Sequence, residues 1–183
     1  MAAGLRLSDD HDAVSEVLKQ LLAALGNQDV AASYSKLDLL WARLAVHIRA
    51  EHLHLFPAVI NRLTESPGGV GPELSDAREL IEKLRADHDF FMRELARAIG
   101  ILRELTSTTP RPGDDTKLDA VGNTVRELKE RLATHNVIEE HQIYRWSSTI
   151  LTKAEQLELR GRINAELEVR PPRFSAEAWA NCL

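Results

Sequence analysis

Two short stretches of this chain each pair an imidazole with a carboxylate four residues later. In the first stretch His47 is followed by Glu51, and in the second His135 is followed by Glu139. Because an α-helix completes a turn in about 3.6 residues, residues four apart lie on the same helix face. Two such faces turned toward each other would supply two nitrogen donors and two carboxylates to one interior point. This set of groups predicts a metal-binding site.

The two stretches belong to a longer internal repeat. Aligned without a gap from the two histidines, they place Phe56 opposite Tyr144 and Leu55 opposite Ile143. Upstream of each stretch lies an Asp-His-Asp triplet, centred on His11 and on His88. The chain therefore reads as two helical hairpins of one pattern, and pseudo-twofold symmetry would bring six polar groups to the interior. The six candidate ligands are His11, His47, Glu51, His88, His135 and Glu139.

These residue types indicate a particular kind of metal chemistry. Imidazole nitrogen suits iron, zinc and copper, and carboxylates can bridge a pair of hard cations. With four histidines and two bridging carboxylates, each of two metals would receive two nitrogens and two oxygens. An oxo or hydroxo bridge would add a fifth donor and leave one octahedral position open. An iron pair with open positions is a site for O₂, peroxide or NO.

The order His, His-x-x-x-Glu, His, His-x-x-x-Glu resembles the hemerythrin and HHE cation-binding family, over about residues 11–146. The doubled positions are Glu51-His52 and Glu139-Glu140, and after two further residues they are followed by Leu55-Phe56 and Ile143-Tyr144. This spacing is similar to that family's recurring Glu-Glu-x-x-Leu/Ile-Phe/Tyr-Pro. The resemblance implies a four-helix bundle around two non-haem iron ions joined by an oxo (Fe–O–Fe) or hydroxo bridge. It also implies that the four histidines are terminal ligands and that Glu51 and Glu139 are bridges.

The chain departs from the oxygen carriers of this family at two positions. Those carriers have a further histidine one turn before the third-helix ligand, where this chain has Leu84. Their last ligand is an aspartate five residues after the histidine, where this chain has Glu140. Five residues place that side chain about 140° around the helix from His135, so Glu139 is the expected ligand and Glu140 the alternative.

The missing fifth histidine favours a protein that binds, senses or reacts with O₂, peroxide or NO in a redox or stress role. Three alternatives stay open at this point. The first is an iron- or oxygen-sensing module that acts through a protein partner contacted by its C-terminal segment. The second is a reversible O₂ carrier, and the third is a metal-free structural bundle. Whether the protein is an enzyme, and its oligomeric state, are left open.

Apolar residues at spacings of three and four predict four long helices. We expect the first to run from an N-cap at Ser8 to Gly26-Asn27, which are suited to a left-handed cap. The second should start near Asp29 and continue to about Leu63 with a kink at Pro57. The third should run from residue 72 or 75 to 105, and Asp114 or Asp115 should cap the fourth, with loops over 65–72 and 106–116.

The expected fold class is therefore all-α, an up-down four-helix bundle with an additional C-terminal helix and tail. A capping box from Thr152 to Glu155 predicts that a fifth helix of about sixteen residues follows and ends before Pro171. The tail beyond it either packs through Phe174 and Trp179 or is loose. We expect residues 1–150 to form the hemerythrin-like domain, with residues 151–183 packed on it or extending from it.

Composition limits the function classes. The chain has 183 residues, 44% of them hydrophobic, and a net charge of −5, which favour one globular domain and argue against a nucleic-acid surface. No apolar run is long enough to span a membrane, and the N-terminus lacks the apolar block of a secretory signal. Cys182 alone can build neither an internal disulfide nor a thiolate cluster, so we expect a reducing, cytoplasmic location.

Other polar and aromatic residues lie near the predicted site, and we expect most of them not to bind metal. His54 is expected behind the ligands or facing solvent, and His52 and His141 are expected to be exposed. The aspartates beside His11 and His88 either orient imidazoles or are ordinary helix-start charges. The aromatic residues nearest the site are assigned to the core: Trp41, Tyr144 and Trp146. Charged residues from Arg103 to Arg131 are interpreted as a solvated helix face.

Overall fold

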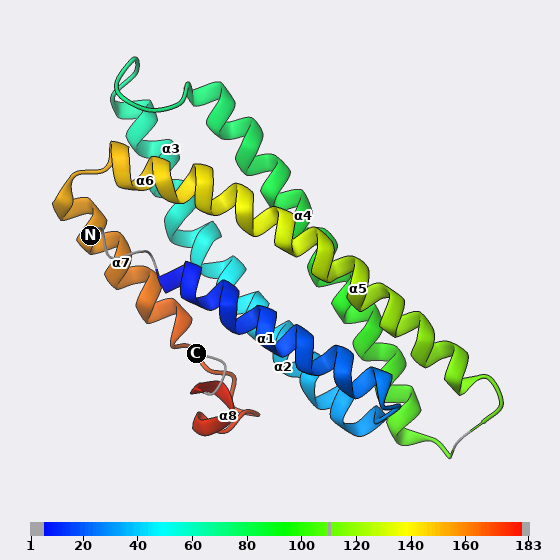
Figure 1. Ribbon diagram of the computed structural model, residues 1–183. Helices are drawn as coiled ribbons and strands as arrows, with labels where there is room; N and C mark the ends of the chain where they lie inside the picture. Colours follow the sequence, from blue (N-terminus) through cyan, green and yellow to red (C-terminus); the bar gives the residue numbers. More distant parts are fainter. Residues whose placement is uncertain (1–5, 110, 181–183) are drawn as a thin grey trace.

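The computed structural model describes residues 6–109 and 111–180, and within these residues it contains helices and no strand. Cys182 lies outside the described residues. Four long helices lie side by side (Figure 1). They are α1 (Arg6–Gly26), α2 (Val30–Ala50), α4 (Leu74–Ser107) and α5 (Asp114–Ile138). Helices α1 and α4 each pack against both α2 and α5, so the four helices enclose a common interior.

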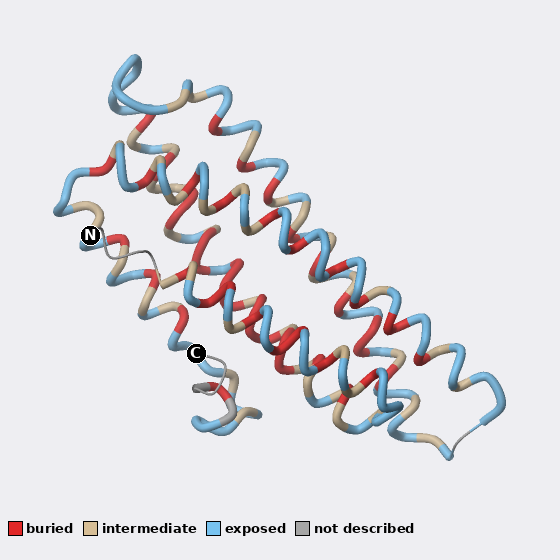
Figure 2. The backbone as a smooth tube through the Cα atoms, viewed as in Figure 1, coloured by how far each residue is buried: buried red, intermediate tan, exposed pale blue. Residues whose placement is uncertain are grey.

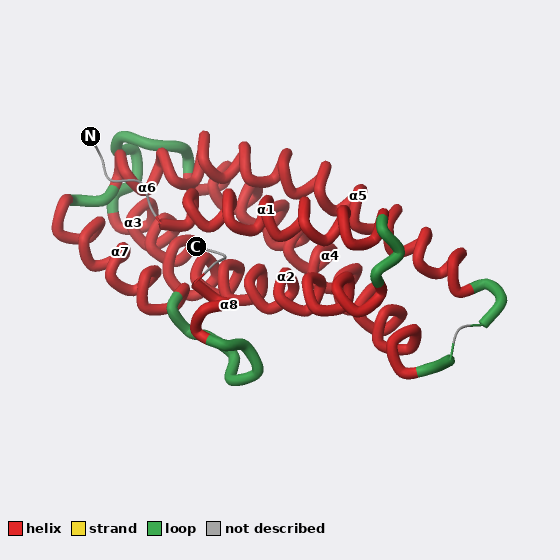
Figure 3. Tube along the Cα trace, turned by 60° about the horizontal axis from the view of Figure 1, so that its bottom comes forward, coloured by secondary structure: helices red, strands yellow, loops and turns green. Residues whose placement is uncertain are grey.

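Shorter helices extend this set (Figure 3). Helix α2 continues through a π-helical segment, η1 (Glu51–Leu55), into α3 (Phe56–Glu65). In the same way α5 continues through η2 (Glu139–Tyr144) into α6 (Arg145–Ile150). Helix α7 (Lys153–Leu167) packs against α1, α2 and η1, and the last helix of the described residues is α8 (Ala176–Ala180). The predicted all-α class is confirmed.

The buried residues recur along each long helix, on the sides where the helices face one another (Figure 2). On α4, the buried residues include Ile81, Leu84, His88, Phe91 and Leu95, at the three- and four-residue spacing of one helix face. Each fully buried leucine or phenylalanine contributes about 1.5–3 kcal/mol relative to an exposed one, which is why the inner stripes hold the helices together. Among the described helices, none combines the length and the apolar character needed to cross a membrane.

The start of α1 differs from the prediction, whereas the start of α2 confirms it. Helix α1 already begins at Arg6, so Ser8 lies inside the helix and is not its N-cap. The residue with a left-handed backbone is Gln28, with φ of 56°, one position after the predicted Gly26-Asn27 pair. Helix α2 starts directly after Asp29, as predicted, and the Asp29 carboxylate caps it by accepting a hydrogen bond of 2.9 Å from a backbone N–H.

Of two later helix starts, that of α7 agrees with the prediction and that of α5 differs from it. The capping box at α7 is confirmed, since the Thr152 hydroxyl accepts from the Glu155 N–H and the Glu155 carboxylate accepts from the Thr152 N–H. At α5 the N-cap is Gly113, with φ of 95°, and not Asp114. The Asp114 carboxylate instead accepts a hydrogen bond from the backbone of Arg111. Glycine takes this positive φ without steric cost, so it replaces a side-chain cap here.

The chain changes helix type at the two predicted ligand turns, and proline is not the common cause. In η1 the N–H of Phe56 donates to the carbonyl of Glu51, five residues back, so the wide turn precedes Pro57. The second wide turn, η2, occurs where Arg145 replaces the proline. A π-helical turn therefore lies directly before Pro57, where the kink is expected, and the second repeat has the same kind of turn without a proline. Such turns are uncommon and frequently occur at functional sites.

The C-terminal tail packs on the helices, which decides between the two sequence alternatives. Leu159, Ile163 and Leu167 form the buried face of α7. In α8, Trp179 is only 4% exposed, and its ring lies 5.0 Å from the Arg43 guanidinium of α2. The tail therefore covers the α2 side of the interior.

Candidate metal centre

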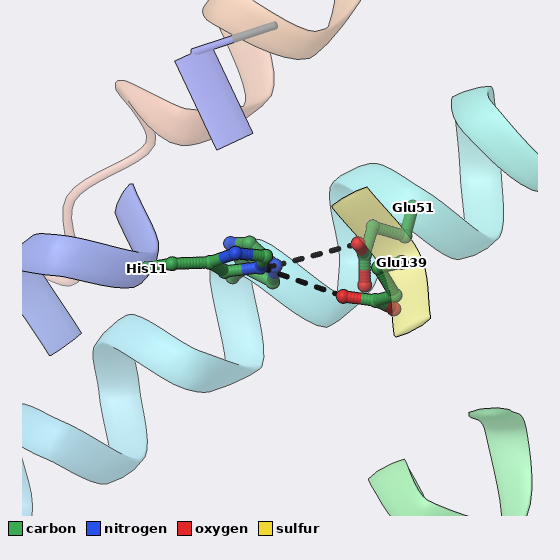
Figure 4. Close-up of side chains that lie close together, drawn as sticks. His11, Glu51 and Glu139 are labelled. Atoms are coloured by element: carbon green, nitrogen blue, oxygen red, sulfur yellow. Dashed lines mark hydrogen bonds and ion pairs between the residues drawn. The ribbon is translucent and has the colours of Figure 1, made fainter. Parts of the chain in front are cut away.

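The structure brings all six predicted ligand residues together in the interior. His11 comes from α1, His88 from α4, and the others from α2–η1 and α5–η2. Figure 4 shows His11 reaching toward the Glu51 and Glu139 carboxylates. None of the six side chains is more than 7% exposed. The site is therefore a buried cluster of ionisable groups, an arrangement that needs a physical reason.

The four imidazoles form two close pairs. The Nε2 atoms of His11 and His47 are 3.2 Å apart, and those of His88 and His135 are 2.9 Å apart. One pair joins α1 to α2 and the other joins α4 to α5, as the internal repeat predicts.

The two glutamates lie between these pairs. Glu139 places one carboxylate oxygen 3.4 Å from His11 Nε2 and the other 3.0 Å from His135 Nε2. Glu51 places one oxygen 3.4 Å from His47 Nε2 and the other 3.3 Å from His88 Nε2. Each carboxylate thus faces both histidine pairs, as a bridging group would.

Carboxylates behind the imidazoles set their orientation. Asp10 lies 2.9 Å from Nδ1 of His47, and Asp87 lies 3.2 Å from Nδ1 of His135. Asp12 and Asp89, the other two aspartates of the triplets, are exposed. Because Nδ1–H donates to an outer acceptor, the lone pair of Nε2 points inward, toward the other ligands.

The other two imidazoles have outer partners that follow the glutamates in sequence. Nδ1 of His11 lies 2.9 Å from Oε1 of Glu140, and Nδ1 of His88 lies 2.9 Å from Nε2 of His52. The Ser8 hydroxyl also donates to Glu140, over 3.1 Å. The expectation that His52 is exposed is therefore wrong: the wide π-helical turn lets two consecutive residues, Glu51 and His52, face the site.

A repeated arginine supports the two aspartates. Arg43 hydrogen-bonds to the Asp10 carboxylate, and Nε of Arg131 donates to Asp87 over 2.9 Å. Arg131 lies on a solvated face as predicted, with a side chain that is 41% exposed, and it also holds Asp87. The sequence carries a signal for both residues, because Arg-Leu-Ala-x-His occurs at Arg43–His47 and again at Arg131–His135.

The centre contains buried oxygen atoms that have no hydrogen-bond donor among the described residues. They are Oε2 of Glu51 and both carboxylate oxygens of Glu139. Leaving such atoms unpaired in a protein interior is costly, and native proteins normally satisfy them. A cation between the imidazole lone pairs and these oxygens would satisfy them. Two groups of side chains have ligand atoms close enough to hold an ion, His11–His47–Glu51–Glu139 and His88–His135–Glu139.

A family model agrees with this reading. The model of the hemerythrin HHE cation-binding domain matches residues 5–147. The chain belongs to this family. Among curated proteins, no sequence match was found. Cation binding is therefore the general property of this HHE domain, and the buried cluster of histidines and glutamates is the place where an ion fits.

Tyr144 also reaches the centre of the HHE domain, although the sequence favoured a place in the aromatic core. Its hydroxyl lies 3.2 Å from His11 Nε2 and donates to Glu51 over 3.2 Å. Burial, with the charges of Glu51 and Glu139, raises the pKa of Tyr144 well above its usual value. Trp41 and Trp146 are half-buried and pack against the hydrophobic core. The polar tip of Tyr144 distinguishes it from Phe56, its equivalent in the first repeat.

Electrostatics without a cation favour protonated imidazole and ionised carboxylate. Burial opposes protonation of His47, but the charge of Glu51 and hydrogen bonds to Asp10 and Glu51 outweigh it and raise the pKa of His47 well above its usual value. Burial likewise opposes the ionisation of Glu139, but the imidazoles of His11, His135 and His88, each with Nε2 within 3.6 Å of its carboxylate, outweigh burial and hold the pKa of Glu139 well below its usual range. Both shifts favour a protonated His47 and an ionised Glu139 in the metal-free centre.

Two other histidines of the HHE domain lie away from the centre. Nε2 of His54 is 3.7 Å from the Glu166 carboxylate of α7, so His54 faces the C-terminal helix and not the ligands. His141 is exposed as predicted, and its Nδ1 lies 2.9 Å from the carbonyl of Val137.

Proposed function

We propose that this HHE domain holds two non-haem iron ions and uses them to bind, sense or react with O₂, peroxide or NO. In this proposal the four long helices form an up-down bundle of residues 1–150, to which residues 151–183 are attached. Glu51 and Glu139 are bridging ligands, and the terminal ligands are the four buried imidazoles, His11, His47, His88 and His135.

One observation carries the proposal: imidazole nitrogens and carboxylate oxygens face one another at 3.0–3.6 Å, and three of the oxygens have no hydrogen-bond donor in the part of the chain that the structure describes. Two nitrogens and shared carboxylate oxygens at each position match the mixed donors that iron accepts. The outer carboxylates Asp10 and Asp87 would keep each Nε2 free for metal binding. When bound, an iron pair supplies a ferrous–ferric couple and open coordination positions.

The space beside the centre supports a small ligand. A cavity of about 10 Å³ is lined by the four buried histidines together with Val14, Leu44, Leu132 and Asn136. This volume is close to the minimum that one water molecule needs. A diatomic molecule or peroxide fits that scale, whereas an organic substrate does not.

Metal analysis and optical spectroscopy test the proposal. We expect about two iron ions per chain in wild-type protein supplied with iron, and fewer than two after Glu51→Ala or Glu139→Ala. His141→Ala, which changes an exposed histidine, should leave the iron content unchanged. Unchanged iron after Glu139→Ala would reject Glu139 as a bridge, and protein without bound metal after supply of iron would favour a structural bundle.

Exposure of the reduced, iron-loaded protein to peroxide or NO tests the reactive role. We expect ferric absorption bands to appear or change and peroxide to be consumed. A stable, fully reversible oxygen adduct without turnover would instead identify an oxygen carrier.

A second candidate is a sensor that acts through the C-terminal segment, and a chain of contacts favours it. Trp179 lies over Arg43, Arg43 bonds to Asp10, and Asp10 bonds to His47. Metal binding at His47 would therefore reach the tail through three contacts. Limited proteolysis should show stronger protection after Thr152 with iron than without it; identical cleavage would exclude the sensor.

A further inference from the structure

The two metal positions of the proposed centre have different surroundings. We call the position beside His11 and His47 the α1/α2 position, and the position beside His88 and His135 the α4/α5 position. The internal repeat makes a direct comparison possible, since each residue on one side has an equivalent on the other. At two of the equivalent places that contact the ligand histidines, His52/Glu140 and Phe56/Tyr144, the residue types differ in charge or polarity, and both differences favour the α1/α2 position.

The first difference lies behind the imidazoles. Glu140 accepts from Nδ1 of His11, whereas the equivalent residue His52 meets Nδ1 of His88, each at 2.9 Å. A carboxylate on Nδ1–H makes the imidazole a stronger donor through Nε2 and adds a negative charge near the cation. His52 carries no negative charge in any protonation state, so it cannot supply this stabilisation.

The second difference lies inside the centre. The Tyr144 hydroxyl is 3.2 Å from both His11 Nε2 and Glu51 Oε1, while its equivalent Phe56 offers His88 only a stacked ring, with centroids 6.1 Å apart. The number of side chains that could bind an ion also favours the α1/α2 position. Four side chains have ligand atoms within 4.8 Å of one another at the α1/α2 position, and three do so at the α4/α5 position.

We propose that the two metal positions are unequal, that the α1/α2 position fills first and holds its ion more tightly, and that Glu140 is the positioning residue chiefly responsible. This inference rests on the proposed two-metal function. Glu140 acts through His11, which it orients and polarises, and the Ser8 hydroxyl holds it in place. The α4/α5 position, with fewer donors, loses its ion first when metal is scarce.

Titration of the metal-free protein with Co²⁺ against a competing chelator tests this, with the visible absorption of bound cobalt as the readout. We expect two ions per chain, the first bound at least tenfold more tightly than the second. His47→Ala should remove the tight class and His135→Ala the weak class, which assigns each class to a position.

Two charge substitutions then test the cause. Glu140→Gln keeps size and hydrogen-bonding capacity but removes the charge, so the tight class should weaken about tenfold while the weak class is unchanged. His52→Glu should tighten the weak class and bring the two affinities together. Ser8→Ala removes only the hydroxyl that donates to Glu140, so it should weaken the tight class in the same way but by less. Agreement between the two variants would show that a folding defect in Glu140→Gln is not the cause.

The outcomes separate the inference from the function on which it rests. Two classes of equal affinity, or weakening by Glu140→Gln of the class that His135→Ala removes, would overturn the inference and leave the two-metal site intact. Fewer than two cobalt ions bound under all conditions would overturn the proposed function as well.

Discussion

The two halves of this HHE domain carry the same local sequence in different surroundings. Arg43 and Arg131 each precede a ligand-site histidine by four residues, and each bonds to an aspartate of the neighbouring helix. Yet the Arg43 side chain is 0% exposed and that of Arg131 is 41% exposed.

The cause of the difference lies outside the repeat. Residues after α6 fold back over the α2 side, and Trp179 covers the Arg43 guanidinium. On the other side, Arg131 stacks at 4.0 Å over Phe90 at the surface. The arginine of one local motif can thus be buried or exposed, depending on whether a segment distant in sequence covers it. The four experiments below test this contrast.

The largest expected contrast is between Arg43→Ala and Arg131→Ala. Removing one member of a buried ion pair costs about 3–5 kcal/mol, because Asp10 would keep its buried charge with one partner fewer. Removing a partly exposed partner costs about 0–1 kcal/mol. Urea unfolding of the metal-free variants measures both free energies of unfolding. Equal losses would mean that the two sides are buried to the same extent in solution.

Replacing the cover itself should have a smaller effect. Trp179→Ala removes a buried aromatic side chain and its contact with Arg43, and we expect a loss of about 2 kcal/mol together with faster proteolysis of the tail. Val169→Ala, at a residue 46% exposed in the same segment, is the matched control and should have little effect. A Trp179→Ala variant with unchanged unfolding would contradict the assignment of the tail as the cover of Arg43.

The third contrast concerns metal affinity at the α4/α5 position, on the side where Arg131 is exposed. Asp87 orients His135, so Asp87→Asn should weaken Co²⁺ binding at the α4/α5 position about tenfold. Asp89→Asn alters an exposed aspartate on the same helix and serves as the control. The chelator competition described above measures both. Equal affinities of the two variants would show that Asp87 is only a partner of Arg131.

The sequence contained enough information for the helices and for the gathering of the six polar groups. A spacing of four residues fixes a shared helix face, and the internal repeat fixes which faces meet, so the convergence of His47 and Glu139 follows from pattern alone. The capping side chains of Asp29 and Thr152 act within one turn, and they were predictable for the same reason.

Features that depend on helix type or on distant segments were not predictable in this way. The π-helical turns change which consecutive residues face inward, so His52 was wrongly expected at the surface. The burial of Arg43 depends on Trp179, which is far away in sequence and packs through no periodic pattern. The role of Tyr144 depends on its hydroxyl alone, because the rest of its ring could equally belong to a residue of the hydrophobic core. The repeated Arg-Leu-Ala-x-His, by contrast, was available in the sequence and was missed.

The smallest contrast is in the pH dependence of the metal-free domain. Glu51 and Asp10 outweigh burial at His47, and Glu139 outweighs it at His135, so the pKa of each imidazole is raised above 6.5, more strongly at His47. A group with a raised folded pKa contributes stability that is complete below pH 6.5 and is lost as the pH rises through the folded pKa. The urea midpoint of metal-free protein should therefore fall as pH increases from about 6 to 9, and His47→Gln should flatten this dependence more than His135→Gln. Metal loading should reverse the trend, because a metal ion displaces the protons and binds better at higher pH. A metal-free midpoint that rises with pH would show that the buried carboxylates are not balanced by protonated imidazoles, which would remove the electrostatic reason for expecting a cation at the centre.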